Sequence, residues 1–302
     1  MNIVFMGTPV FAQIVFEVLC DKHNILAVVT QPDKPVGRKN IITPPPVKLA
    51  AVKNNITVMQ PQVLDSAFGE AIKILCPDVI IVVAYGKILP RFVLDIAPCI
   101  NLHASILPKY RGASPIQQMI LSDDSDFGIS IMQMSDGVDS GDILCIKKFA
   151  RSNEDYPTLA QRLAKLGAQA ICEVLEKFDT IQPYPQDEAQ ASYCKKITKA
   201  DGLIDFDDAQ YIYKKWLAFK EWPGLYLASG IKLFEISVAE SNLITDTLDS
   251  AKSGEILNIK PCIIACKKGA LLIGAMQSPS RKRMQADVFL RSRSLKIGDI
   301  LQ

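Results

Sequence analysis

The chain has 302 residues, of which 49% are hydrophobic and 22% charged, and its formal net charge is +2. This length and apolar content suffice for two folded domains, which excludes a small fold held together by disulfides. No apolar run reaches the ~18 uncharged residues of a membrane span, and the opening MNIVFMGTP lacks the pattern of a signal peptide, so we expect a cytoplasmic protein.

The first half of the chain alternates runs rich in Ile and Val with segments of helical periodicity. The runs, which have the composition of strands buried on both faces of a parallel sheet, are residues 2–6, 25–30, 78–84, 99–103 and 128–134. The helical patterns cover residues 10–19, 47–53 and 66–75. This order predicts a doubly wound α/β domain, whose ligands bind beyond the carboxyl ends of the parallel strands.

Four segments follow these strands and are candidate site loops: residues 7–9, 30–33, 84–86 and 102–104. Gly7 marks a tight turn into a helix, where an anion could bind at the helix N-terminus. No GxGxxG pattern follows this glycine, so the sequence does not indicate a dinucleotide cofactor.

Residues 31–46, QPDKPVGRKNIITPPP, contain five prolines. Proline interrupts both helices and central strands, so we expect a long exposed loop here. Arg38 and Lys39 follow Gly37 and give this loop a positive charge, which is either functional or merely solvated.

The apolar residues of 158–177 form one stripe at helical spacing, so we predict a helix there. This helix closes the first domain. We place domains at residues 1–189 and 207–302, with a linker over 190–206. A helical segment at 209–219 opens the second domain. The short alternating runs that follow predict a small OB-like β-barrel; they are residues 231–238, 254–259, 262–265 and 270–273.

The second domain carries the positive charge of the chain. Residues 251–302 hold ten Lys and Arg against three acids, a net charge of +7 that leaves −5 for the rest. Such a basic end indicates either a polyanionic partner or an ordinary solvated face. The eight cysteines are scattered, and their only close pair, Cys262 and Cys266, lacks further ligands for a zinc site in a chain with two histidines, so we predict no metal.

The segment most informative about chemistry is Asn101-Leu102-His103, where a predicted strand leaves the sheet. Residues two apart on a strand point to the same face, so the amide and the imidazole should converge. An amide donor stabilises a developing oxyanion while an imidazole moves a proton, which suits acyl transfer. A lone histidine is also a common structural hydrogen-bonding residue.

A carboxylate that orients the imidazole could come from the loop SDGVDSGD, residues 135–142. Its acids are Asp136, Asp139 and Asp142, and a carboxylate beside an imidazole favours the charged ring. Asp and Gly are also usual in turns, and local sequence leaves the choice among the three acids open.

These residues lie in two motifs, NLHASILPKYRGASPIQ and MSDGVDSGDIL, that resemble the signature of the formyltransferases using 10-formyltetrahydrofolate. The resemblance extends over the whole chain, through VFMGTPVFA, VVTQPDKPVGR, AYGKILP, WPGLY and GAMQSPSRKRMQADVFL. It implies a Rossmann-like amino domain joined to an OB-like carboxyl domain. It further implies a monomer that transfers the formyl group to the methionine amine of initiator methionyl-tRNA, without a metal.

The resemblance also implies roles for individual residues. Asn101, His103 and Asp139 would form the catalytic group. The folate would lie against six residues: Ser105, Ile106, Leu107, Pro108, Tyr85 and Gly86. The tRNA would contact Arg38, Lys39, Lys267, Lys268, Arg281, Lys282 and Arg283.

Two other functions remain compatible with parts of the sequence. A formyltransferase acting on a nucleotide sugar, or the hydrolase part of a folate enzyme, would share the amino-domain motif but would not explain the basic carboxyl domain. A non-catalytic RNA-binding protein would explain the basic domain but would leave Asn101, His103 and Asp139 without a role.

Overall fold

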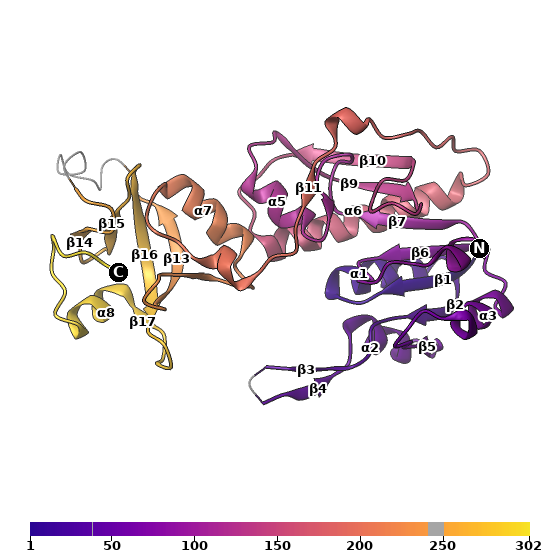
Figure 1. Cartoon of the computed structure of the whole chain (residues 1–302), viewed down its shortest axis with the longest axis horizontal. Coiled ribbons are helices and arrows are strands. Elements are labelled where there is room, and N and C mark those ends of the chain that lie inside the picture. Colours follow the sequence, from indigo (N-terminus) through magenta and orange to yellow (C-terminus); the bar gives the residue numbers. More distant parts are fainter. Residues whose placement is uncertain (38, 241–250) are drawn as a thin grey trace. The chain divides into compact units, whose positions relative to one another are not determined.

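In the computed structural model of the chain, the described residues are 1–37, 39–240 and 251–302. They form two compact units (Figure 1). The larger unit comprises residues 1–119, 124–152 and 158–195, and the smaller comprises 120–123, 153–157 and 196–302. The second unit therefore resumes at Lys196, inside the linker predicted at 190–206.

The larger unit is built on a seven-stranded sheet in the order β10-β9-β7-β6-β1-β2-β5. In chain order its strands are β1 (Asn2–Gly7), β2 (Asn24–Val29), β5 (Val58–Met59), β6 (Val79–Val83), β7 (Cys99–His103), β9 (Asp126–Gln133) and β10 (Ile143–Ala150). The first five run parallel to one another. The predicted parallel α/β arrangement is confirmed for β1, β2, β6 and β7, whereas β5 was not predicted.

The strand predicted at residues 128–134 exists as β9, but the expectation that it runs parallel to the others was wrong. β9 runs antiparallel to β7, and β10 antiparallel to β9. The chain leaves β7 at His103 and enters β9 near the same edge of the sheet, so it needs no crossover to return antiparallel. This return places the segment that joins the two strands directly beside the end of β7.

Helices flank the sheet. Those with residues in the larger unit are α1 (Val10–Cys20), α2 (Pro46–Lys53), α3 (Ser66–Ile74), α4 (Arg91–Leu94), α5 (Pro115–Leu121) and α6 (Tyr156–Glu176). Four of them, α1, α2, α3 and α6, match the predicted helical patterns, whereas α4 and α5 were not predicted. α1 contacts β1, β2 and β6, while α2 contacts β2 and β5. In α6, a Cβ at Gly167 would come too close to the methyl carbons of Leu102, so any larger residue there would force this side chain on β7 to move.

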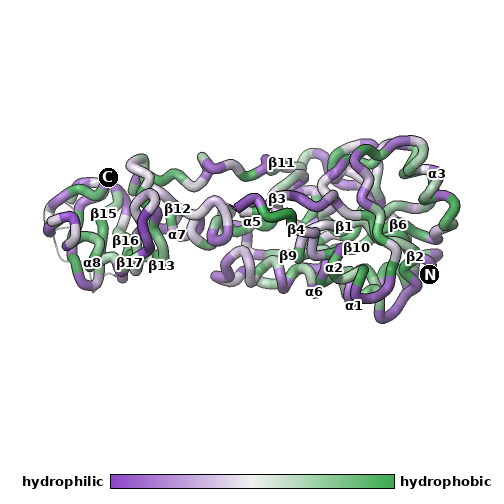
Figure 2. Tube along the Cα trace, turned by 90° about the horizontal axis from the view of Figure 1, so that it is seen from below, coloured by the Kyte–Doolittle hydropathy of each residue, from purple (hydrophilic) through white to green (hydrophobic). Residues whose placement is uncertain are grey.

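The core of the larger unit lies around the central strands. All five residues of β6 are buried, and the trace through this strand is green in Figure 2, as its run of Val and Ile predicts. β6 carries no polar side chain within its length, so it contributes to the core and only the residues that follow it can take part in chemistry.

The proline segment does contain strands, so the expectation of a loop without secondary structure was wrong. β3 (Lys34–Val36) and β4 (Ile41–Thr43) form a two-stranded antiparallel ribbon (Figure 1). Pro35 lies within β3, which is tolerated because each strand of such a ribbon is an edge strand. Arg38, which lies between the two strands in sequence, is outside the described residues.

Two short segments tie distant parts of the larger unit together. β8 (Arg111–Gly112) pairs in parallel with β11 (Tyr193–Cys194). A 3₁₀ helix, η1 (Glu188–Gln190), precedes β11. The chain between α6 and the second unit thus returns to the segment that follows β7.

The smaller unit is an antiparallel β domain, as predicted. Its elements are η2 (Lys199–Gly202), α7 (Ala209–Ala218), β12 (Leu225–Tyr226), β13 (Lys232–Val238), β14 (Ile256–Asn258), β15 (Ile263–Ala265), β16 (Ala270–Gln277), β17 (Met284–Gln285) and α8 (Ala286–Ser292). The sheet order is β12-β13-β16-β15-β14, with β17 also on β16. Within the described ranges, no helix of either unit has the length and apolar character needed to cross a membrane.

Candidate active site

Asn101 and His103 project from the end of β7 toward the same carboxylate. The amide Nδ2 of Asn101 lies 3.4 Å from Oδ1 of Asp139, and Nδ1 of His103 lies 3.6 Å from Oδ2 of the same residue. Asn101 and His103 are only 8% and 5% exposed. The structure therefore brings the three residues of the predicted catalytic group together in a nearly dry environment.

A second acceptor faces the other nitrogen of the His103 ring. The ring Nε2 lies 2.9 Å from the backbone carbonyl oxygen of Tyr110. A carbonyl oxygen can only accept, so Nε2 carries the proton in this arrangement. In the neutral ring, Nδ1 then carries no proton and faces the carboxylate of Asp139. A ring protonated on both nitrogens would donate to the Tyr110 carbonyl and to the Asp139 carboxylate. The position of this histidine is thus fixed from two sides.

Asp139 reaches the site from the loop between β9 and β10. That loop leaves the sheet where Met134 N–H donates to the carbonyl of Cys99, at the start of β7, and Asp139 adopts a left-handed backbone with φ of +49°. Its Oδ2 accepts a 2.8 Å hydrogen bond from the backbone N–H of Gly112. Of the other two acids, Asp136 pairs with Arg91 and Asp142 is exposed, so geometry distinguishes the three acids that local sequence could not.

The predicted folate segment forms a closed turn after β7. Ser105 is fully buried, and its hydroxyl donates to the carbonyl of Lys109 at 2.6 Å. Ser130 on β9 donates to the carbonyl of Ser105 and accepts from Leu107 N–H, which is also buried. Ile106 and Pro108 are half-buried, so they are the members of this segment whose side chains reach a surface.

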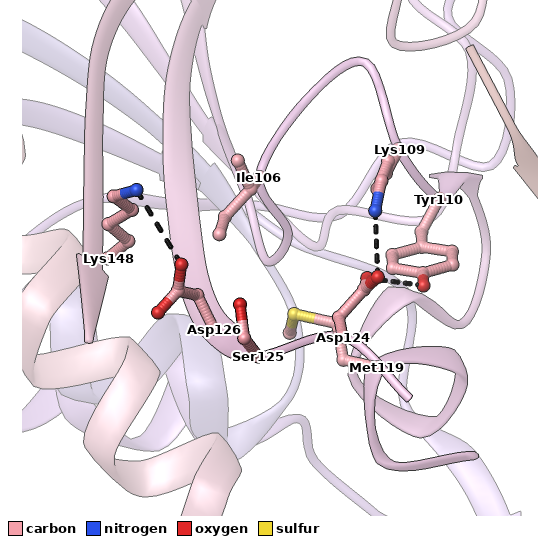
Figure 3. Close-up of a pocket in the computed structure, with 8 residues that line it drawn as sticks. All are labelled: Ile106, Lys109, Tyr110, Met119, Asp124, Ser125, Asp126 and Lys148. Atoms are coloured by element: carbon pink, nitrogen blue, oxygen red, sulfur yellow. Dashed lines mark hydrogen bonds and ion pairs between the residues drawn. The ribbon is translucent and has the colours of Figure 1, made fainter. Parts of the chain in front are cut away.

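A pocket borders the turn after β7, and Ile106 and Asp124 are among the residues that line it (Figure 3). Asp124 accepts from Lys109 Nζ at 2.7 Å and from the hydroxyl of Tyr110 at 2.6 Å. Burial opposes the shift, but these two hydrogen bonds hold the pKa of the Asp124 carboxyl below its usual range. The phenol of Tyr110 is thereby anchored, and with it the carbonyl that faces His103.

The remaining predicted folate residues, Tyr85 and Gly86, follow β6. The carbonyl of Tyr85 accepts from Thr8 Oγ1 at 3.0 Å and from Gln31 Nε2 at 3.2 Å. Three of the four predicted site loops therefore meet at one carbonyl. The ring of Tyr85 is buried in the core, whereas Gly86 is exposed with φ of +83°.

The predicted tRNA contacts are exposed cations. Lys39 is exposed beside the β3–β4 ribbon, whereas Arg38 lies outside the described residues. In the smaller unit Lys267 pairs with Asp207, Lys268 lies 4.0 Å from Asp208, and Arg283 pairs with Glu235. Within the part of the chain that the structure describes, Arg281 and Lys282 are exposed and form no ion pair.

Sequence reasoning missed the backbone groups that complete the site. The carbonyl of Tyr110 and the N–H of Gly112 contact His103 and Asp139, but every residue carries such groups, so they leave no trace in composition. Gly112 offers a weak signal because its φ of +118° favours glycine.

Two domain families match the chain. The family described as formyl transferase matches residues 1–175, and the formyl transferase C-terminal domain matches residues 196–294. The methionyl-tRNA formyltransferase of a Nitratiruptor species is 45% identical over 305 residues, which cover 99% of this chain and 99% of that protein. The similarity therefore extends through both units.

Solved structures share the fold at lower identity. HypX from Aquifex aeolicus in complex with tetrahydrofolic acid has a TM-score of 0.64 at 18% identity; the match covers 96% of this chain and 47% of HypX, so this chain spans about half of that protein. The methionyl-tRNA formyltransferase from Clostridium thermocellum has a TM-score of 0.58 at 19% identity, covering 80% of this chain and 95% of that one. These likenesses extend the agreement to the fold of both units.

Proposed function

The chain belongs to the methionyl-tRNA formyltransferase family, and from this premise we propose how its residues carry out the reaction. The enzyme transfers a formyl group to the amine of methionine on methionyl-tRNA. We propose 10-formyltetrahydrofolate as the donor and the initiator tRNA as the carrier of the methionine. A bond forms between the amine nitrogen and the formyl carbon, and the bond from that carbon to the folate nitrogen breaks.

Asn101 stabilises the oxyanion that develops on the formyl oxygen. Its Nδ2 carries two hydrogens, and the long 3.4 Å contact to Asp139 occupies at most one of them. The residue is 8% exposed, so its amide forms its hydrogen bond in a site that holds little water. A donor fixed before the charge develops needs no reorganisation, and one such donor contributes ~3 kcal/mol.

Both ring nitrogens of His103 face protein acceptors in the structure, so Nε2 exchanges the Tyr110 carbonyl for the substrate when it assists the oxyanion and passes its proton to the departing folate nitrogen. Asp139 supports this role because its carboxylate oxygen Oδ2 lies 3.6 Å from Nδ1 and can accept from that nitrogen when it carries a proton. The Tyr110 carbonyl holds the opposite nitrogen, which limits rotation of the ring. The net proton balance is a proton lost by the amine and one gained by the folate.

The folate binds against the turn after β7 and the loop after β6. Ile106 and Pro108 offer half-buried apolar surface, and Gly86 offers exposed backbone. Ser105 and Leu107 are buried, so we propose that they contribute by holding the turn in shape through Ser130 rather than through direct side-chain contact.

The tRNA binds to the β3–β4 ribbon and to the basic surface of the smaller unit. The ribbon exposes Ile41 and Ile42, which are 61% and 63% accessible and which follow the cationic residues Arg38 and Lys39 in the sequence. Exposed apolar side chains beside cations suit a nucleic acid, whose bases stack and whose phosphates carry charge. Arg281 and Lys282 supply cations in the smaller unit that need not leave a carboxylate partner.

The observation that carries this proposal is the convergence of Asn101 and His103 on Asp139 at the end of β7. Purified protein should be incubated with 10-formyltetrahydrofolate and methionylated initiator tRNA, with N-formylmethionyl-tRNA as the readout. Parallel reactions should offer methionylated elongator tRNA and a nucleotide-linked amino sugar. We expect rapid formylation of the initiator tRNA alone; preferential formylation of the amino sugar would contradict the proposed acceptor.

A further inference from the structure

A buried arginine lies next to the catalytic group without contacting its side chains. Arg111 is the first residue of β8 and its side chain is 1% exposed. Its guanidinium donates to Gln186 Oε1 from Nε at 3.0 Å and from Nη2 at 2.8 Å, and to Glu188 from Nη1 at 2.9 Å and from Nη2 at 2.6 Å. A third partner, the hydroxyl of Tyr193, lies 3.3 Å from Nη1. The charge is thus fully coordinated and geometrically fixed.

The amide that Arg111 orients grips the loop carrying Asp139. With its oxygen occupied by the guanidinium, Gln186 directs Nε2 at the carbonyl of Asp139, at 2.9 Å, and at the carbonyl of Gly141, at 2.7 Å. The two N–H groups of one buried amide therefore hold the backbone at residue 139 and two residues beyond it. Among neutral side chains, only the carboxamides of glutamine and asparagine offer an acceptor oxygen and two N–H donors on one planar group.

The same strand that carries Arg111 holds the other side of Asp139. The N–H of Gly112 donates to the carboxylate at 2.8 Å, while the guanidinium one residue earlier holds the amide on the backbone of the loop. Asp139 itself adopts a left-handed backbone, a region that aspartate enters more readily than most non-glycine residues. The contacts from Gln186 and Gly112 hold it in this conformation.

We propose that Arg111 and Gln186 are positioning residues for the formyl transfer reaction, acting through Asp139. The guanidinium fixes the amide of Gln186, the amide fixes the loop, and the loop sets the carboxylate against Asn101 and His103. This inference rests on the proposed function of those three residues. It assigns a catalytic consequence to a polar cluster that would otherwise only join the segment after α6 to the segment after β7.

The substitution Gln186→Glu separates positioning from folding. Glutamate has the shape of glutamine and still accepts from Arg111, so the buried cation remains neutralised. It presents an oxygen instead of two N–H groups to the carbonyls of Asp139 and Gly141, which should displace the loop. Gln182→Glu makes the same charge change at an exposed position in the same segment and serves as the matched control.

The kinetic test is steady-state formylation of methionyl-tRNA with both substrates varied. A displacement of ~1 Å at a reacting group costs ~10²-fold in rate, so we expect Gln186→Glu to lower kcat by about 100-fold with little change in KM for the tRNA. Gln182→Glu should retain the kcat of the unsubstituted chain. A fall in kcat smaller than about threefold for Gln186→Glu would overturn the proposal.

A double-substitution cycle decides whether a larger fall acts through Asp139. If Gln186 works only by placing this carboxylate, Gln186→Glu should have almost no further effect on kcat once Asp139→Asn is present. Multiplicative losses in the doubly substituted protein would mean that Gln186 acts independently of Asp139, and the proposal would be wrong. The same cycle with Arg111→Lys, which keeps the charge but loses the planar fork, tests the outer residue.

The histidine ring offers a readout that does not depend on activity. The chain has only two histidines, so ¹⁵N-labelled rings give signals for His103 and for His23 as an internal reference. Gln186→Glu should shift the ring nitrogens of His103 and leave those of His23 unchanged. Unchanged His103 signals would overturn the proposal even in a protein that formylates tRNA, whereas shifted signals in a protein without activity would place the failure in the proposed function instead.

Discussion

The polar residues at the end of β7 and the cations of the smaller unit differ in how they are held. Asn101 and His103 are buried and surrounded by fixed partners, so each atom has one available position. Lys267 and Arg283 are exposed and pair with neighbouring carboxylates. The first arrangement suits the stabilisation of a short-lived charge, and the second suits the reversible binding of a large polyanion. Substitutions in the two regions should therefore differ in the size of their effect on formylation, in the salt dependence of that effect and in the kinetic step that they alter.

The largest effect should follow removal of a group that touches the reacting atoms. We expect Asn101→Ala or His103→Ala to lower the single-turnover rate by about 10²–10³-fold, because the oxyanion or the departing nitrogen loses its donor. Affinity for methionyl-tRNA, measured by filter binding, should be essentially unchanged, since neither residue is proposed to contact the tRNA body. His23→Ala removes the other histidine and serves as control. A rate near that of the unsubstituted enzyme in either variant would show that the buried residues at the end of β7 do not carry the chemical step.

A smaller effect should follow a change in the backbone that supports the site. Gly112 has φ of +118°, and an added Cβ would clash with the carbonyl oxygen of Cys194. We expect Gly112→Ala to cost about 1–3 kcal/mol of unfolding free energy and to lower kcat, because the N–H that binds Asp139 must move. Chemical denaturation and formylation kinetics measure the two effects. Gly298→Ala is the control, since Gly298 also has a positive φ of +91° and none of the described atoms lies near its added Cβ.

Changes among the exposed cations should act on binding rather than on chemistry. Arg281→Ala with Lys282→Ala should raise KM for tRNA and leave kcat unchanged. The slope of log affinity against log salt should fall by about 1 for each phosphate that the protein no longer neutralises. Lys267→Ala should have a smaller effect, because this cation must leave Asp207 before it can bind a phosphate. An equal loss of tRNA affinity for all three cations, without any change in salt dependence, would show that the ion pair of Lys267 does not affect its contribution to binding.

The smallest effect concerns Glu188, the exposed carboxylate that accepts from the buried guanidinium of Arg111. The hydrogen bond from Arg111 holds the pKa of the Glu188 carboxyl below its usual range. A carboxylate with a lowered pKa contributes stability above its unfolded pKa and loses that contribution as the pH falls through the folded value. We expect the Tm of Glu188→Gln to vary less than that of the unsubstituted chain as the pH falls from neutral into the acid range. Parallel acid profiles would show that the pair makes no contribution.

The sequence predicted those parts of the fold that have a strong local signal. β6 is a short run of buried Val and Ile, and α1 and α6 have clear helical periodicity, so local composition was sufficient for them. The β3–β4 ribbon was missed because its prolines suggested that no strand could form there. The direction of β9 was also beyond local reasoning, because a buried run reads the same in a parallel and an antiparallel pairing.

The candidate site shows the same limit. Asn101 and His103 lie two residues apart, so strand geometry alone predicted that they would converge. Asp139 could not be separated from Asp136 and Asp142, since its position depends on contacts with Gly112 and Gln186, which are distant in sequence. The family resemblance supplied the choice, and the structure supplies a physical reason for it.

The most direct test of this account is the isosteric substitution Asp139→Asn in a single-turnover formylation of initiator methionyl-tRNA at saturating 10-formyltetrahydrofolate. The variant keeps the shape of the side chain but removes the charge that faces His103. It also leaves one acceptor oxygen where the carboxylate offers two, one to Asn101 and one to Gly112 N–H. We predict a rate at least about 100-fold below that of the unsubstituted enzyme with tRNA affinity retained. A variant that formylates at the unsubstituted rate would contradict the claim that this buried trio performs the reaction.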